Sequence, residues 1–143
     1  MKKTLYILLI LLITACNFGK SQNSNNGMIK QTELTNVKLK DYGFLDCMYR
    51  DSYFPKFLVD KCKNILVNMC GTIETETPEN LEELYKITQS ATDKLNDLED
   101  EFFENNSEIE TGARECLGAN FAYISEAYGF DADVEELIAT RNW

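Results

Sequence analysis

The stretch that decides the fold is residues 80–103, NLEELYKITQSATDKLNDLEDEFF. Its apolar positions recur at alternating spacings of three and four residues, which is typical of one buried helix face. This seam consists of Leu81, Leu84, Thr88, Ala91, Leu95, Leu98 and Phe102. The spacing predicts the longest helix of the chain, with Thr77 as its N-cap and Pro78 in its first turn. Such a seam is most often core, and a coiled-coil homodimer is the alternative.

Two helices are predicted upstream of this seam. Residues 43–53 carry apolar side chains at helical spacing, with Asp41 as a possible cap. A second helix is expected to begin near Pro55. Its apolar face consists of Leu58, Cys62, Ile65, Leu66 and Met69. Gly71 is a natural helix-ending residue, so residues 72–77 (TIETET) are predicted to form an extended connection.

Downstream of the seam, residues 104–112 (ENNSEIETG) are polar and acidic and are predicted to form a loop. The next helix has an inner face of Ala113, Cys116, Leu117, Asn120, Ile124 and Ala127, broadened by Phe121, Tyr123 and Tyr128. Gly129 is expected to stop it. Asp131 is expected to cap a last helix, whose inward residues are Val134, Leu137 and Ile138. The predicted fold class is therefore all-α, with about five helices in an irregular bundle.

The chain begins with a pattern typical of a bacterial lipoprotein signal. Lys2 and Lys3 precede an apolar run too short to span a bilayer. Residues 13–16 (ITAC) resemble a lipobox, which implies cleavage before Cys16 and lipidation of its sulfur. An ordinary signal peptide with a nearby cysteine is the alternative. The expected organisation is a signal peptide (1–15), a lipidated cysteine with a flexible polar tether (16–36) and a helical domain (37–143).

This signal predicts where the protein resides. Export places the domain outside the cytoplasm, where disulfides persist, and lipidation attaches it to a membrane. Asn17 directly follows the cysteine, and by resemblance to lipoprotein sorting signals this favours the outer membrane. We expect the protein to be anchored on the periplasmic face of that membrane. Removal of residues 1–15 leaves 12 basic and 24 acidic side chains, a net charge of −12.

Composition disfavours several classes of function. The whole chain has a formal charge of −10, which argues against nucleic acid as a partner because phosphates attract clustered Lys and Arg. It also has no histidine. This excludes His-ligated zinc and the common Ser-His and Cys-His nucleophilic pairs. We therefore expect a binding protein that is not an enzyme and needs no cofactor or metal.

Four cysteines remain once Cys16 is set aside: Cys47, Cys62, Cys70 and Cys116. On one continuous helix, Cys62 and Cys70 are about 12 Å apart, too far for a disulfide. Two full pairings stay open: Cys47–Cys62 with Cys70–Cys116, or Cys47–Cys70 with Cys62–Cys116. A single disulfide with two buried thiols is also open.

The carboxylates form clusters but no recognisable catalytic pair. The largest cluster consists of Asp97, Glu99, Asp100, Glu101 and Glu104. Solvated surface is the plainer interpretation of these residues. At the C-terminal end of the predicted long helix they would oppose the helix dipole. We expect a basic partner to relieve this repulsion and to associate faster because of it.

Four stretches resemble the amidase immunity proteins of type VI secretion. They are residues 39–48 (LKDYGFLDCM), residues 71–74 (GTIE), the seam helix 80–103, and residues 112–125 followed by 134–138 (VEELI). Together they cover about residues 39–141 in the same order. The resemblance implies a helical periplasmic protein, acting often as a dimer, that blocks the active-site cleft of a papain-like cell-wall amidase. The lipid anchor departs from the family, many of whose members are soluble in the periplasm.

This resemblance also implies particular residues. The cysteines in the first and penultimate helices match the family's, which implies a Cys47–Cys116 disulfide. The cleft-blocking segment corresponds to the loop before the second of these helices. Its predicted partner-binding residues are Glu104, Asn105, Asn106, Ser107, Glu108 and Glu110. A structural or adaptor lipoprotein of the envelope, with no toxin partner, is the alternative function.

Overall fold

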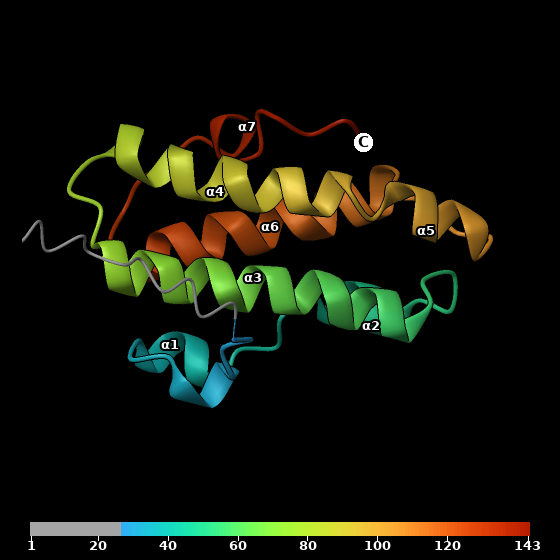
Figure 1. Ribbon diagram of the computed structural model, residues 1–143, viewed down its shortest axis with the longest axis horizontal. Coiled ribbons are helices and arrows are strands. Elements are labelled where there is room, and N and C mark those ends of the chain that lie inside the picture. The colour runs from blue at the N-terminus through green and yellow to red at the C-terminus, as the bar shows by residue number, and fades with distance from the viewer. Residues whose placement is uncertain (1–26) are drawn as a thin grey trace, which may run out of the picture.

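The computed structural model describes residues 27–143, so the predicted signal peptide and Cys16 lie outside the described residues. This part of the chain is all-α, as the sequence predicts (Figure 1). It contains one 3-10 turn, η1 (Gln31–Glu33), and seven α-helices. In order these are α1 (Val37–Lys40), α2 (Asp46–Arg50), α3 (Lys56–Glu76), α4 (Leu81–Asn96), α5 (Glu99–Glu104), α6 (Thr111–Ala127) and α7 (Val134–Leu137). None of them is long and apolar enough to cross a membrane.

Three long helices hold most of the core. Helices α3 and α4 lie side by side and run in opposite directions (Figure 1). Helix α6 contacts α1, α2 and α7, and α7 also packs on α4. Phe44, Phe102 and Phe121 are the largest fully buried side chains, and they come from three separate segments of the chain. Their burial ties these segments into one core, because each aromatic ring removes a large apolar area from water.

The segment before α1 is part of the fold, so the prediction of a flexible tether is wrong for residues 29–36. Leu34 is buried, and the Ile29 N–H donates to Asn68 Oδ1 on α3 at 3.0 Å. The Gln31 side-chain amide donates to the Leu39 and Tyr42 carbonyls, at 2.8 Å each. No apolar period is visible here, because one buried leucine and a set of polar contacts hold this segment in place.

The predicted first helix, residues 43–53, is wrong in its extent. Only α2 is helical within it, and its N-cap residue Leu45 has φ of 58°. Leu45 is fully buried, and its N–H donates to Asn120 Oδ1 on α6 at 3.1 Å. Tertiary packing therefore holds Leu45 in a left-handed conformation that few non-glycine residues adopt. Because of this conformation, α2 begins at Asp46, three residues after the predicted start.

Helix α3 continues past the glycine that was expected to end it. Gly71 is buried in mid-helix, where a Cβ would collide with the Ile29 side chain. The glycine therefore serves close packing. The extended connection predicted for residues 72–77 is wrong, since the helix ends only at Thr77, which has φ of 47°. Thr72 and Thr75 stay helical and donate their hydroxyls to the carbonyls four residues earlier.

The seam is confirmed as core, but the predicted long helix is divided. Helix α4 begins three residues later than expected, with Asn80 as its N-cap. The Asn80 side chain accepts from the Glu83 N–H at 3.0 Å, and the Glu83 carboxylate accepts from the Glu79 N–H at 2.9 Å. Leu84, Thr88, Ala91, Leu95 and Phe102 are buried, while Leu81 is exposed. Because α3 and α7 cover this seam within one chain, it is not available for a coiled-coil homodimer.

Because α4 and α5 are separate helices, the acidic cluster does not lie at the C-terminal end of one long helix, as was expected. Glu99, Asp100 and Glu101 form the first turn of α5, where carboxylates are favourable. The expected repulsion at the end of a long helix is therefore absent for these three residues. Near the C-terminus, α6 stops at Gly129 as predicted, with φ of 88°. The N-cap of α7 is Asp133 and not Asp131, and its side chain accepts from the Glu135 N–H.

Candidate functional site

The predicted partner-binding loop joins α5 to α6 and is fixed to the body at two points. Glu104, Asn105, Asn106, Glu108 and Glu110 are all exposed. Ser107 is 1% exposed, so its prediction as a contact residue is wrong. Its N–H donates to the Phe102 carbonyl at 3.0 Å, and Ile109 is buried two residues later. The loop therefore alternates between inward anchors and outward acidic or amide side chains.

Phe103 stands beside this loop and is 71% exposed. It is the last apolar residue before the loop, and its neighbour Phe102 is fully buried in the core. A hollow of about 270 Å³ adjoins it, lined by Glu99, Asp100, Phe103, Glu108 and Ile109. Phe103 therefore offers an apolar contact beside three carboxylates, whose charges produce a negative electrostatic potential.

Two further exposed aromatic residues come from the start of α3 and the turn before it. Tyr53 is 41% exposed and Phe57 is 48% exposed. Partial burial and the nearby carboxylates of Glu110 and Glu108 raise the pKa of the Tyr53 hydroxyl, so the loop lies close to it. One helical turn after Phe57, Lys61 pairs with Glu101 of α5 at 2.6 Å. We call Tyr53, Phe57, Phe103 and the exposed loop residues the acidic-aromatic end.

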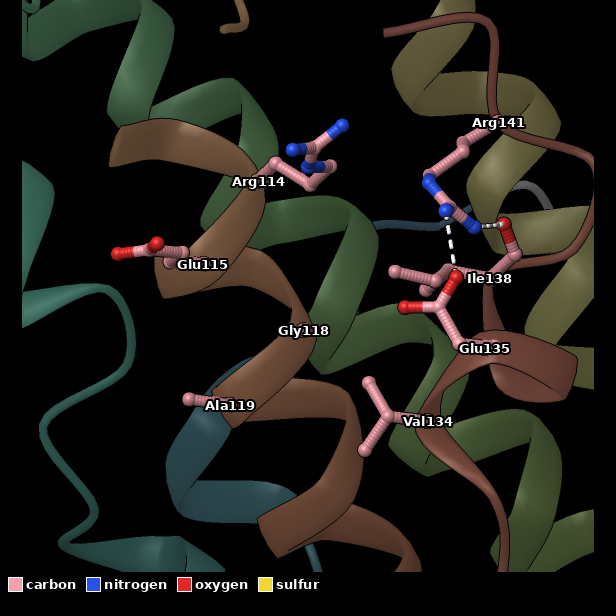
Figure 2. Close-up of a pocket in the computed structure, with 8 residues that line it drawn as sticks. All are labelled: Arg114, Glu115, Gly118, Ala119, Val134, Glu135, Ile138 and Arg141. Carbon is pink, nitrogen blue, oxygen red and sulfur yellow. Dashed lines mark hydrogen bonds and ion pairs between the residues drawn. The ribbon is translucent and has the colours of Figure 1, made fainter. Parts of the chain in front are cut away.

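A second feature is a groove between α6 and the C-terminal segment, with a volume of about 510 Å³ (Figure 2). Arg114, Gly118 and Ala119 line it from α6. Val134, Ile138 and Arg141 line it from α7 and the residues that follow. Neither arginine stands out in the sequence, because they are 27 positions apart and no local pattern links them.

The structure pairs Cys47 with Cys116 at disulfide-bonding distance, as the family resemblance implies. Their Cα atoms are 6.1 Å apart, within the range that a disulfide spans. Neither full pairing derived from helix geometry is formed. Cys62 and Cys70 are free and buried in α3, and burial raises the pKa of both thiols to about 12. Thiols in this state are poor nucleophiles.

The described residues contain no group of three or more histidine, cysteine, aspartate or glutamate side chains arranged to hold a metal ion. The carboxylates of the acidic-aromatic end are exposed. What this end offers chemically is a surface: apolar rings, amide groups and a negative field.

The described residues therefore form a small all-α protein in which the Cys47–Cys116 disulfide joins the short α2 to the long α6. A model of a family of unknown function, DUF5713, matches residues 38–143, and the chain belongs to that family. The match starts after the segment of residues 29–36 that packs on α3. No curated protein and no solved structure matches the chain.

Proposed function

We propose that this protein is an envelope lipoprotein that binds a cell-wall amidase toxin of type VI secretion and blocks its active-site cleft. The N-terminal lipoprotein pattern supports the location, and the resemblance over residues 39–141 supports the role. The observation that carries the proposal is the acidic-aromatic end. There, an exposed Phe103 stands beside a loop whose outward side chains are acidic or amides.

The anchoring of the loop suits it to steric inhibition. Buried Ser107 and Ile109 hold its backbone in place before any partner arrives. A segment fixed in this way loses less conformational entropy on binding than a mobile one. Phe103 supplies the central apolar contact, and Glu104, Glu108 and Glu110 attract a basic rim on the toxin. No chemistry on the immunity protein itself is needed.

The test is binding between the full chain and the cell-wall hydrolases of the envelope. Lipid-modified full chain is cross-linked in living cells, purified and searched for a cysteine hydrolase. Phe103→Ala removes the exposed ring and Glu108→Lys reverses a loop charge. Val37→Ala and Glu126→Lys are the matched controls, since both residues are exposed and lie away from the loop.

We expect the wild-type chain and both controls to recover a hydrolase and to inhibit its cleavage of peptidoglycan. Phe103→Ala is expected to weaken binding by about tenfold or more, as removal of a central aromatic contact does. Recovery of a hydrolase equally by all variants would contradict the assignment of the loop. Recovery of envelope scaffolding proteins without any hydrolase would favour the adaptor function instead.

A further inference from the structure

Six large apolar side chains are exposed in the described part of the chain. Three of them belong to the acidic-aromatic end, and a fourth, Leu81, begins α4. The other two are Met28, which is 67% exposed, and Val37, which is 78% exposed. Both lie in residues 27–41, which contain η1 and α1 and which we call the N-terminal segment. The proposed contact with a toxin leaves these two side chains unexplained.

The N-terminal segment lies at one edge of the molecule. In Figure 1, η1 and α1 (blue and cyan) lie on the opposite side of α3 from α4 and α7, and well apart from α5. Buried Leu34 and Leu39 hold the segment on the body. Because Leu39 is buried, Val37, two positions earlier on α1, lies on the outward face of this helix. The outer surface of the segment is therefore open to a partner.

Charge is distributed unevenly between this segment and the rest of the domain. Three exposed lysines of the segment form no ion pair within residues 27–143; they are Lys30, Lys38 and Lys40. Its acidic residues are Glu33 and Asp41, and the Glu33 carboxylate accepts from the Lys30 N–H at 3.1 Å. Residues 42–143 carry eight basic and 22 acidic side chains. An anionic surface is therefore repelled by most of the domain but not by this segment.

The position of the predicted lipid anchor favours a bilayer as the partner of this surface. Cys16 precedes Ile29, whose N–H donates to Asn68 on α3, by 13 positions. A chain of that length spans at most about 45 Å when fully extended, so a lipid on Cys16 holds the segment near the membrane. Phospholipid leaflets present anionic phosphates above acyl chains. Exposed lysines beside exposed apolar side chains match both layers.

We propose that the N-terminal segment is a membrane-contact surface, which lies on the phospholipid leaflet that holds the lipid anchor. Met28 and Val37 enter the interfacial layer, and the three lysines lie beside lipid phosphates. This contact orients the domain, because its strongly acidic remainder is turned away from the leaflet. The acidic-aromatic end stays open to a partner. The inference rests on the lipid anchor of the proposed function and not on the identity of the toxin.

The test follows single fluorescent probes on the lipid-modified chain in vesicles of phosphatidylethanolamine and phosphatidylglycerol. Mass spectrometry first establishes that the chain purified from membranes carries acyl chains. A polarity-sensitive fluorophore is attached at Val37→Cys or, as the control, at Lys94→Cys, an exposed position on α4. Labelling is selective because Cys62 and Cys70 are buried. Quenching by lipids brominated in their acyl chains measures contact with the membrane.

A second arm tests the role of charge with the probe kept at position 37. Lys38→Glu reverses a lysine of the N-terminal segment, and Lys94→Glu is the matched control. Both lysines are exposed and form no ion pair within the described residues, and both variants have the same net charge. Circular dichroism shows whether each variant is folded.

We expect the probe at position 37 to be quenched and shifted to the blue, and the probe at position 94 to be neither. Lys38→Glu should shift the equilibrium away from contact by about fivefold or more, as expected for one basic side chain at an anionic surface. Lys94→Glu should leave it unchanged, and added NaCl should weaken the quenching.

Two outcomes would overturn the proposal in distinguishable ways. Equal signals from the two probe positions on an acylated chain would exclude the membrane contact and leave the lipid anchor standing. A chain without acyl groups would remove the anchor and this inference with it. Equal effects of Lys38→Glu and Lys94→Glu would exclude the role of the lysines.

Discussion

Glu74 is the residue at which three separate segments meet. Its carboxylate accepts from the Thr35 and Asn36 N–H groups, at 2.8 and 2.9 Å, and from the Tyr128 hydroxyl at 2.8 Å. Burial acts to raise the pKa of this carboxyl, but the hydrogen bonds from Thr35, Asn36 and Tyr128 outweigh burial and hold the pKa below its ordinary value. Glu74 therefore ties the N-terminal segment and the end of α6 to α3.

This lowered pKa predicts a pH-dependent contribution to stability. A carboxyl whose pKa is lower in the folded state stabilises fully above its unfolded pKa, and the contribution is lost as the pH falls through the folded pKa. We expect Glu74→Gln to lower the free energy of unfolding by about 1–2 kcal/mol at pH 7. The difference in free energy of unfolding between the wild type and Glu74→Gln should become smaller below about pH 4. Urea denaturation across this pH range measures it.

Glu76→Gln is the matched control. Glu76 is exposed, lies two residues further along α3, and makes no side-chain hydrogen bond within residues 27–143. A gap between wild type and Glu74→Gln that stays constant from pH 7 to pH 3 would contradict this role of the carboxylate.

Asn120 was predicted only to lie on the inner face of its helix, and in the structure it makes two buried hydrogen bonds. It is 3% exposed, accepts from the Leu45 N–H and donates to the Cys116 carbonyl at 2.8 Å. Asn120→Leu would leave the buried Leu45 N–H without a partner, and we expect a loss of about 1–3 kcal/mol in the free energy of unfolding. Thermal and urea denaturation measure this loss. Wild-type stability in this variant would show that the hydrogen bond contributes nothing.

At the scale of elements, the Cys47–Cys116 pair joins the short α2 to the long α6 across 69 residues of sequence. Helix α2 has only five residues and little stability of its own. We expect the double variant Cys47→Ser with Cys116→Ser to lose about 2–4 kcal/mol, because a cross-link over a long loop restricts the unfolded chain. Urea denaturation with and without a reductant measures the difference.

Reductant should destabilise the wild type and leave the double variant unchanged. Thiol labelling provides the control, since Cys62 and Cys70 should react only after denaturation. A wild-type chain that is indifferent to reductant would contradict the cross-link.

The elements also show how far sequence alone can predict this fold. Periodicity identified the seam of α4 and the inner face of α6, because each is a repeated local signal. It failed at Leu45 and Gly71, where the deciding contacts come from residues distant in sequence. It also missed the boundary between α4 and α5. Gly71 is the clearest case: Ile29, 42 positions earlier, explains a glycine that looked like a helix end.

The candidate site was predictable in part for the same reason. The polar run 104–110 is a local composition signal, so its exposed residues could be named. The inward turn of Ser107 depends on a backbone contact to Phe102, and the approach of Tyr53 depends on tertiary packing. Neither leaves a trace in a single sequence. Phe103 could have been found, since it falls outside the three-four spacing of the seam directly before the loop.

At the scale of the whole molecule, a formal charge of −10 and an acidic loop predict electrostatic attraction to a basic partner. If the proposed toxin is the partner, we expect its association rate with this protein to fall as salt is raised, because salt screens long-range attraction. Stopped-flow association at increasing NaCl concentration measures this. Glu108→Lys should show a slower rate and a weaker salt dependence, whereas a rate independent of salt would remove the proposed role of the acidic loop.

If the protein protects cells by binding a toxin, as proposed, its loss should be visible as reduced survival. A strain lacking this gene is grown in contact with kin that deliver the amidase, and the survivors are counted. We expect the deletion strain to be killed. The full chain or its Glu126→Lys variant should restore survival, and the double variant Phe103→Ala with Glu108→Lys should not. Equal survival of the deletion strain and the parent would contradict the proposal.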